Sequence, residues 1–150
     1  MLNTLSRFFA LLHFLWAALV FLAGMFAVLP FIVFCTLVFR GKRSQDAAFV
    51  FIRLWARMFS LLAFFFCRVE GHAAYRADRP YVFVSNHTSF LDAVMLVLVL
   101  PQSFKPLGKI EMARVPVFGM IYRKVAVLID RTSRESRERC VEELKAEVSG

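Results

Sequence analysis

The sequence has few acidic residues, few cysteines and no glycine-rich phosphate loop. Its 150 residues include 19 Lys and Arg but only 11 Asp and Glu, a formal net charge of +8. Cys35, Cys67 and Cys140 are far apart and lack zinc-ligand spacing, which argues against zinc modules and favours reduced thiols in a cytoplasm-facing protein. We therefore expect no metal and no bound cofactor.

Lys, Arg, Asp and Glu are absent from one long stretch, residues 8–39. As one helix it would exceed the roughly 30 Å hydrocarbon core of a bilayer. Gly24 and Pro30 interrupt the run, so we expect either one tilted transmembrane helix or a re-entrant helical hairpin. The run is too long for a signal peptide. His13, inside it, is expected to be hydrogen-bonded or interfacial.

Basic residues flank the apolar stretches. Arg40, Lys42 and Arg43 follow the first run, against Arg7 before it. This asymmetry predicts that the C-terminal part faces the cytoplasm from the inner membrane. Anionic lipid headgroups explain the basic charge better than nucleic acid, because no nucleic-acid-binding signature accompanies it.

A second apolar stretch, residues 47–67, carries Arg53 and Arg57 on one helical face. This pattern predicts an amphipathic interfacial helix, with a buried core helix as the alternative. A hydrophobic content of 59% is too high for an ordinary soluble protein. We therefore expect membrane-anchoring helices over residues 1–68 and a globular part over 69–150.

The sequence of the globular part predicts an α/β fold. Aromatic and β-branched residues predict a strand near 81–85, another near 125–129 and a third possible near 104–108. Apolar periodicity predicts helices over about 90–99 and 133–148, the latter opening on a capping box at Thr132-x-x-Glu135.

Between the first predicted strand and helix lie His87 and Asp92. A histidine in such a loop can take a proton, and a carboxylate can hold its imidazole in one tautomer. The plainer interpretation is that Ser89-x-x-Asp92 is only a capping box.

Asn86-His87 followed by Asp92, after a strand, resembles the first motif of the glycerolipid acyltransferases, the family of 1-acyl-glycerol-3-phosphate acyltransferases. The resemblance implies that His87 is the general base that deprotonates an acceptor hydroxyl. It also implies that Asp92 stabilises the resulting imidazolium, with the substrate alcohol in the place of a protease serine. No enzyme nucleophile is then needed.

Two later stretches extend the resemblance. Residues 108–112, Gly-Lys-Ile-Glu-Met, with Pro116 and Gly119, are similar to a Lys-x-Glu-Leu … Pro … Gly stretch of the family. Residues 125–131 are similar to its second motif, which ends Ile-Asp-Arg, although Val125 replaces the usual glycine. The resemblance implies that Arg131 contacts the acceptor phosphate and that Lys109 assists. By themselves these residues also fit solvated charges and turn chemistry.

The family's third motif, Phe-Pro-Glu-Gly-Thr-Arg, and its fourth, proline-bearing motif do not occur in the sequence. The resemblance runs from about residue 69 to 150, roughly the first half of the family's domain. We expect a transmembrane or re-entrant helical segment followed by part of a mixed α/β acyltransferase domain, truncated before the third motif. A natural short protein without activity is the alternative.

The resemblance implies a membrane-bound acyltransferase of phospholipid biosynthesis. It would move a fatty acyl group from acyl-CoA or acyl carrier protein, as co-substrate, to the 2-hydroxyl of 1-acyl-glycerol-3-phosphate and give phosphatidic acid. Its partners would be the lysophospholipid, the acyl donor and membrane lipids. Two alternatives stay open: another lysolipid acceptor, or an inactive membrane module that binds anionic lipid through Arg53 and Arg57.

Overall fold

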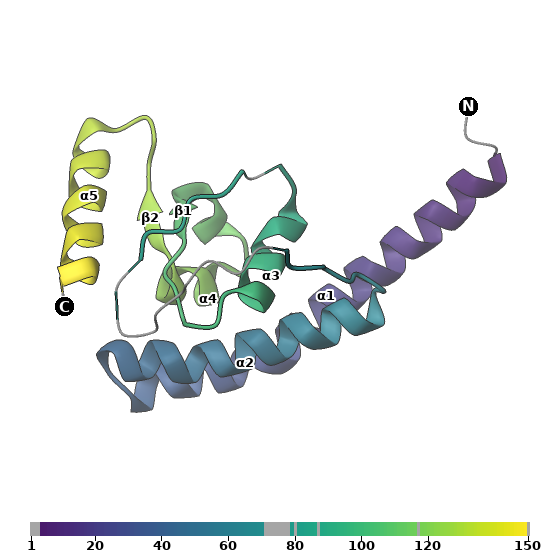
Figure 1. The fold of residues 1–150 in the computed structure, drawn as a ribbon, viewed down its shortest axis with the longest axis horizontal. Coiled ribbons are helices and arrows are strands. Elements are labelled where there is room, and N and C mark those ends of the chain that lie inside the picture. Colours follow the sequence, from purple (N-terminus) through teal and green to yellow (C-terminus); the bar gives the residue numbers. More distant parts are fainter. Residues whose placement is uncertain (1–3, 71–78, 80, 87, 117, 150) are drawn as a thin grey trace. The chain divides into compact units, whose positions relative to one another are not determined.

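A computed structural model of the chain describes residues 4–70, 79, 81–86, 88–116 and 118–149. The chain divides into two compact units (Figure 1). The first unit is Met1–Val69 with Phe90–Leu100, and the second is Glu70–Ser89 with Pro101–Gly150.

The first unit is helical and contains α1 (Thr4–Val38), α2 (Gly41–Leu62) and α3 (Phe90–Val99). Helices α1 and α2 lie side by side as an antiparallel hairpin (Figure 1). Aromatic pairs mark the seam between them: the rings of Phe31 and Phe51 stack at 5.1 Å, and those of Phe21 and Trp55 meet edge-on at 4.8 Å. The residues buried in α1 and α2 recur at helical spacing, so each helix buries one stripe; they include Met25, Ile32, Cys35, Phe49, Ala56 and Phe59.

The apolar run forms one helix, so the expectation of a re-entrant hairpin within residues 8–39 is wrong; the hairpin is made by α1 with α2. A proline inside a helix costs about 3 kcal/mol, yet α1 continues through Pro30, and residues before and after it pack against α2. Phe31 stacks on Phe51, and Gly24 lets the Trp55 ring approach so closely that a Cβ at Gly24 would lie 2.7 Å from Trp55 Cδ1. Among the described residues, α1 is the helix long and apolar enough to cross a membrane.

Helix α2 begins and ends about five residues before the predicted 47–67 interval. Its end is built by the backbone: Phe64 has φ +57°, and the Phe65 N–H donates to the Ser60 carbonyl at 2.9 Å. This 6→1 bond is that of a Schellman cap, which ends a helix whatever its apolar pattern.

Side chains of α1 complete the cap of α2. The imidazole of His13 donates from Nε2 to the Ala63 carbonyl at 3.0 Å, and the Trp16 indole donates to the Leu62 carbonyl at 2.8 Å. Carbonyls in the last turn of a helix lack intrahelical partners. His13 is therefore hydrogen-bonded, as its position in an apolar run predicts.

The second unit contains β1 (Leu107–Lys109), η1 (Ile110–Arg114), α4 (Phe118–Val125), β2 (Val127–Ile129) and α5 (Arg134–Ser149). In the described part of this unit the sheet consists of β1 and β2, which are parallel, with Leu107 opposite Val127 and Lys109 opposite Ile129. Helix α5 packs on β2 and buries Cys140. The predictions of helices over 90–99 and 133–148 and of a strand within 125–129 are confirmed, and the possible strand near 104–108 is seen as β1.

The prediction of a strand near 81–85 is wrong. Residues 81–86, all described, have no regular secondary structure, and the side chains of Val82 and Val84 are 76% and 92% exposed. An aromatic and β-branched pattern makes a strand only when a neighbour completes the backbone ladder. In the described residues neither strand of the sheet pairs with this segment.

The contact between α4 and η1 gives Gly119 a packing role. Its Cα faces the Ala113 carbonyl so closely that an added Cβ would overlap it. The Arg123 guanidinium donates to the same carbonyl, from Nε at 3.2 Å and Nη2 at 3.0 Å. Gly119 is thus required for close helix-to-backbone packing and not for a turn.

Candidate functional site

The parallel sheet brings the two predicted phosphate ligands to one edge. Lys109 is the last residue of β1 and lies opposite Ile129, the last residue of β2. Arg131 follows two residues later, and the carboxyl ends of parallel strands share an edge of the sheet. Both side chains are exposed, and Arg131 has no hydrogen-bond or ion-pair partner among the described residues. An anion at this edge could be contacted by both.

A tyrosine from α4 lies beside Lys109. The Lys109 backbone N–H donates to the Tyr122 hydroxyl, and burial raises the pKa of Tyr122, so the phenol stays neutral at physiological pH. Gly108 makes room for this ring, because an added Cβ would overlap the hydroxyl. The glycine before Lys109 is therefore explained by a side chain that sequence reasoning missed, since a lone tyrosine on a short amphipathic helix carries no distinctive signal.

Arg131 stands in a turn held by hydrogen bonds of its neighbours. Asp130 Oδ1 accepts from the Thr132 N–H at 2.9 Å and from its hydroxyl at 2.6 Å. The Asp130 N–H donates to Ser136 Oγ at 3.0 Å, and the Ser136 N–H donates to Ser133 Oγ at 3.2 Å. The turn thus joins the end of β2 to the first turn of α5.

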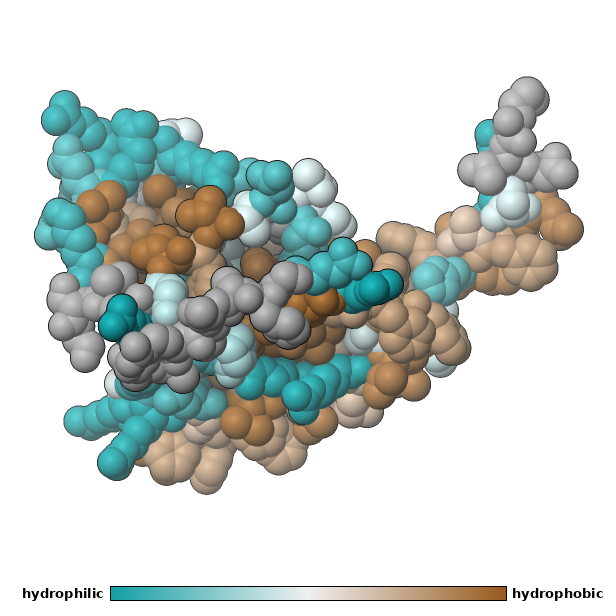
Figure 2. All heavy atoms as spheres, viewed as in Figure 1, coloured by the Kyte–Doolittle hydropathy of each residue, from teal (hydrophilic) through white to brown (hydrophobic). Residues whose placement is uncertain are grey.

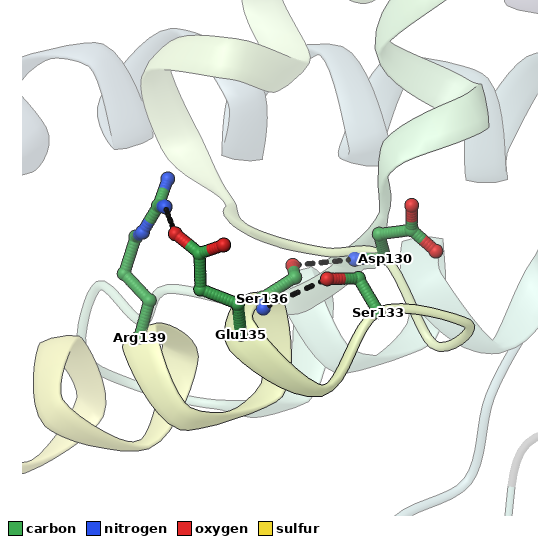
Figure 3. Close-up of polar contacts among 5 residues, drawn as sticks. All are labelled: Asp130, Ser133, Glu135, Ser136 and Arg139. Atoms are coloured by element: carbon green, nitrogen blue, oxygen red, sulfur yellow. Dashed lines mark hydrogen bonds and ion pairs between the residues drawn. The ribbon is translucent and has the colours of Figure 1, made fainter.

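The expected capping box of α5 is replaced by a different cap. Ser133, and not Thr132, caps the helix, because its hydroxyl accepts the Ser136 N–H. Glu135 pairs instead with Arg139 at 2.8 Å, on the exposed face of α5 (Figure 3). Thr132 instead donates hydrogen bonds to Asp130. Such local bonds to aspartate compete with helix capping.

Of the two residues of the predicted catalytic dyad, the structure describes Asp92 and not His87. Asp92 is half-buried in the first turn of α3, where the helix dipole favours a carboxylate. His87 lies outside the described residues. Asp92 belongs to the first unit, whereas Lys109 and Arg131 belong to the second.

Arg53 of α2 holds the other end of α3. Its Nη2 donates to the Leu100 carbonyl at 2.9 Å and its Nε to the Val97 carbonyl at 3.4 Å, while the guanidinium lies 5.4 Å from the Phe49 ring centre. A cation at a helix C-terminus satisfies both the carbonyls and the dipole. Arg57, on the same side of α2, is exposed. Of the predicted pair of lipid-facing arginines, Arg53 is therefore half-buried and hydrogen-bonded to α3, and Arg57 is exposed.

The cysteines are all free; Cys35 and Cys140 are buried and Cys67 is exposed. Burial raises the pKa of the Cys140 thiol, which keeps it protonated. Within the described ranges, no group of three or more His, Cys, Asp or Glu side chains could hold a metal ion.

Comparison with known proteins identifies a family. Residues 66–149 match the family model described as Acyltransferase. The chain is 33% identical over 119 residues to 1-acyl-sn-glycerol-3-phosphate acyltransferase LPAT1, chloroplastic, of Arabidopsis thaliana, covering 75% of this chain and 33% of that protein. It is 36% identical over 90 residues to lysophospholipid acyltransferase LPCAT4 of Mus musculus, covering 59% and 17%. No solved structure matches it.

A third relative, 1-acyl-sn-glycerol-3-phosphate acyltransferase BAT2, chloroplastic, of Brassica napus, is 30% identical over 139 residues, or 89% of this chain and 38% of that protein. The chain thus spans between 17% and 38% of the length of these three relatives. The family match covers more than half of the chain. The chain belongs to the glycerolipid acyltransferase family.

Proposed function

We propose that the chain is part of a membrane-bound enzyme that transfers a fatty acyl group from acyl-CoA or acyl carrier protein to the 2-hydroxyl of 1-acyl-glycerol-3-phosphate. The observation that carries the proposal is the common sheet edge of Lys109 and Arg131 in a chain of this family. A guanidinium and an ammonium at one edge suit a phosphate monoester. The Arabidopsis and Brassica relatives are named as acyltransferases of 1-acyl-sn-glycerol-3-phosphate, which supports this acceptor.

The proposed chemistry needs one base and no enzyme nucleophile. The acceptor 2-hydroxyl oxygen attacks the thioester carbonyl carbon while the imidazole of His87 takes the hydroxyl proton. The tetrahedral oxyanion then collapses, the carbon–sulfur bond breaks, and the leaving thiolate takes the proton back from the imidazolium. Asp92 stabilises that imidazolium, and Arg131 with Lys109 holds the acceptor so that its hydroxyl meets His87.

An acyl-transfer assay of the full-length protein tests this function. Each of two donors, oleoyl-CoA and oleoyl-acyl carrier protein, is offered with lysophosphatidate, lysophosphatidylcholine or a monoacylglycerol. Lysophosphatidate should be the best acceptor and phosphatidic acid the product. A preference for lysophosphatidylcholine would replace the proposed acceptor by another lysophospholipid, the class of acceptor named for the mouse relative. Absence of transfer from both donors would overturn the enzyme proposal and favour a lipid-binding module.

The apolar surface of the first unit supports membrane association. The first turns of α1 expose Leu5, Phe8 and Phe9, at 66%, 55% and 60%. A stripe on the outer side of α2 exposes Val50, Leu54, Met58 and Leu61. Figure 2 shows apolar residues over much of the visible face of this hairpin. Large apolar side chains exposed in such number are typical of a membrane-facing element.

Arg57 and Arg53 should respond differently to substitution by alanine. Arg57→Ala should weaken binding to anionic vesicles about fivefold, because one basic side chain near such a surface contributes about 1 kcal/mol. Arg53→Ala should leave vesicle binding close to wild type but loosen α3, whose last carbonyls lose their donor. Flotation with phosphatidylglycerol vesicles measures the first effect and hydrogen exchange of residues 90–100 the second. Equal effects on both readouts would contradict this division.

The side of the membrane that the acyltransferase part faces can be read from Cys67. The charge asymmetry around residues 40–43 predicts the cytoplasmic side for the part that follows α2, provided that α2 lies at the cytoplasmic surface and does not cross the membrane beside α1. Cys67 is free and exposed just after α2, while Cys35 and Cys140 are buried. A membrane-impermeant maleimide should label Cys67 in inverted vesicles and not in intact cells. Labelling in intact cells would reverse the orientation, and Cys67→Ser serves as the blank.

A further inference from the structure

The position of Arg131 depends on a short turn. It lies between Ile129, where β2 ends, and Arg134, where α5 begins. Its side chain is exposed and has no partner among the described residues. The backbone of the turn must therefore set the direction in which the guanidinium is presented.

Asp130 organises that turn. One carboxylate oxygen, Oδ1, accepts both the N–H and the hydroxyl of Thr132, so it bridges the chain across Arg131. The Asp130 N–H is held in turn by Ser136 Oγ of α5 (Figure 3). Asp130 is thus bonded to the residue after Arg131 and to the helix that follows, a local arrangement for which aspartate is well suited.

The negative charge of Asp130 is unfavourable beside an arginine that would bind a phosphate. The hydrogen bond from the Thr132 hydroxyl, with further bonds from backbone N–H groups, keeps the pKa of Asp130 below its usual value. The carboxylate is therefore ionised at neutral pH, next in sequence to an arginine that would bind a phosphate dianion. Like charges repel, so the carboxylate does not itself attract the phosphate, and its hydrogen bonds within the turn point to a structural contribution.

We propose that Asp130 is a positioning residue, whose carboxylate holds residues 130–132 in the turn that presents Arg131 at the sheet edge beside Lys109. The proposal rests on the proposed role of Arg131 in binding the acceptor phosphate. It requires an acceptor oxygen at position 130 and does not require the negative charge. An amide should therefore replace the carboxylate, whereas a methyl group should not.

The test compares Asp130→Ala, Asp130→Asn, Thr132→Val and Arg131→Ala in the full-length enzyme. The matched control is Glu135→Ala, which removes a nearby exposed acidic residue that pairs with Arg139 along α5. The KM for lysophosphatidate and for an uncharged monoacylglycerol is measured for each variant, together with its thermal melting temperature.

Asp130→Ala should raise the KM for lysophosphatidate about tenfold, the size expected when the hydrogen bonds that hold the turn are lost. Thr132→Val should raise it less, because the backbone N–H still reaches Oδ1. Asp130→Asn and Glu135→Ala should stay within about twofold of wild type, and the KM for the uncharged acceptor should not change in any variant.

The outcomes separate this inference from the function on which it rests. If Arg131→Ala raises the KM for lysophosphatidate but Asp130→Ala and Thr132→Val do not, the positioning role is wrong and the phosphate role stands. If Arg131→Ala leaves that KM unchanged, the phosphate role itself fails. A loss in Asp130→Ala that affects both acceptors equally, with a lower melting temperature, would also overturn the positioning role. Should Asp130→Ala not fold, the contrast between Thr132→Val and Asp130→Asn decides.

Discussion

Replacing His87 by alanine in the full-length enzyme should lower the rate of acyl transfer by about 10²- to 10⁴-fold, the contribution of a positioned general base. Without the imidazole, the acceptor hydroxyl must attack as the neutral alcohol, and the leaving thiolate loses its proton donor. The expected pattern is a loss in kcat for every acceptor, because deprotonation is common to all of them. Single-turnover transfer of a radiolabelled acyl group measures the effect.

Two further variants identify the cause of that loss. Asp92→Asn should also reduce kcat, since the orienting charge is removed while the size of the side chain is kept. His13→Ala is the control, because His13 donates to the Ala63 carbonyl in the hairpin and has no part in the proposed chemistry. Vesicle binding should be the same for His87→Ala and wild type. A near-normal transfer rate in His87→Ala would exclude it as the base.

Replacing Arg131 by alanine should raise the KM for lysophosphatidate by about 10- to 100-fold, since a charged hydrogen bond contributes about 1.5 to 3 kcal/mol. The KM for an uncharged monoacylglycerol should stay unchanged, because that acceptor has no phosphate for the guanidinium to bind. Lys109→Ala should have the same direction and a smaller effect, because an ammonium contacts phosphate as a point charge and not through a fork. Steady-state kinetics with both acceptors measure the difference.

Arg134→Ala is the matched control for Arg131. Arg134 is also exposed and only three residues away, but it pairs along α5 with Glu138 at 2.8 Å. An exposed i,i+4 pair contributes little to stability, so this variant should behave as wild type. If Arg131→Ala impaired the uncharged acceptor as much as lysophosphatidate, or if Arg134→Ala matched it, the phosphate role of Arg131 would be wrong.

Local patterns in the sequence were sufficient to predict α3 and α5, but not α4 or the bounds of α2. The apolar run of residues 90–99 and the charge-rich stretch of 133–148 form α3 and α5 within about one residue of the predicted bounds. A helix makes its backbone hydrogen bonds within itself, so its sequence holds most of the information needed. The prediction of a strand near 81–85 failed for the opposite reason. A strand depends on a neighbouring strand that its own residues do not specify.

Motifs in the sequence also pointed to Lys109 and Arg131, but their convergence is a property of the sheet. Residues so far apart along the chain meet at one edge only because β1 and β2 are parallel and Lys109 is in register with Ile129. The sequence did not predict two contacts next to Lys109 and Arg131: that of Tyr122 with Gly108, and that of Asp130 with Thr132. Likewise Arg53 and Arg57 share a face of one helix, yet only the contact with α3 gives Arg53 the Leu100 carbonyl as a hydrogen-bond partner. Such roles come from contacts between distant segments, and these contacts exist only when the chain is folded.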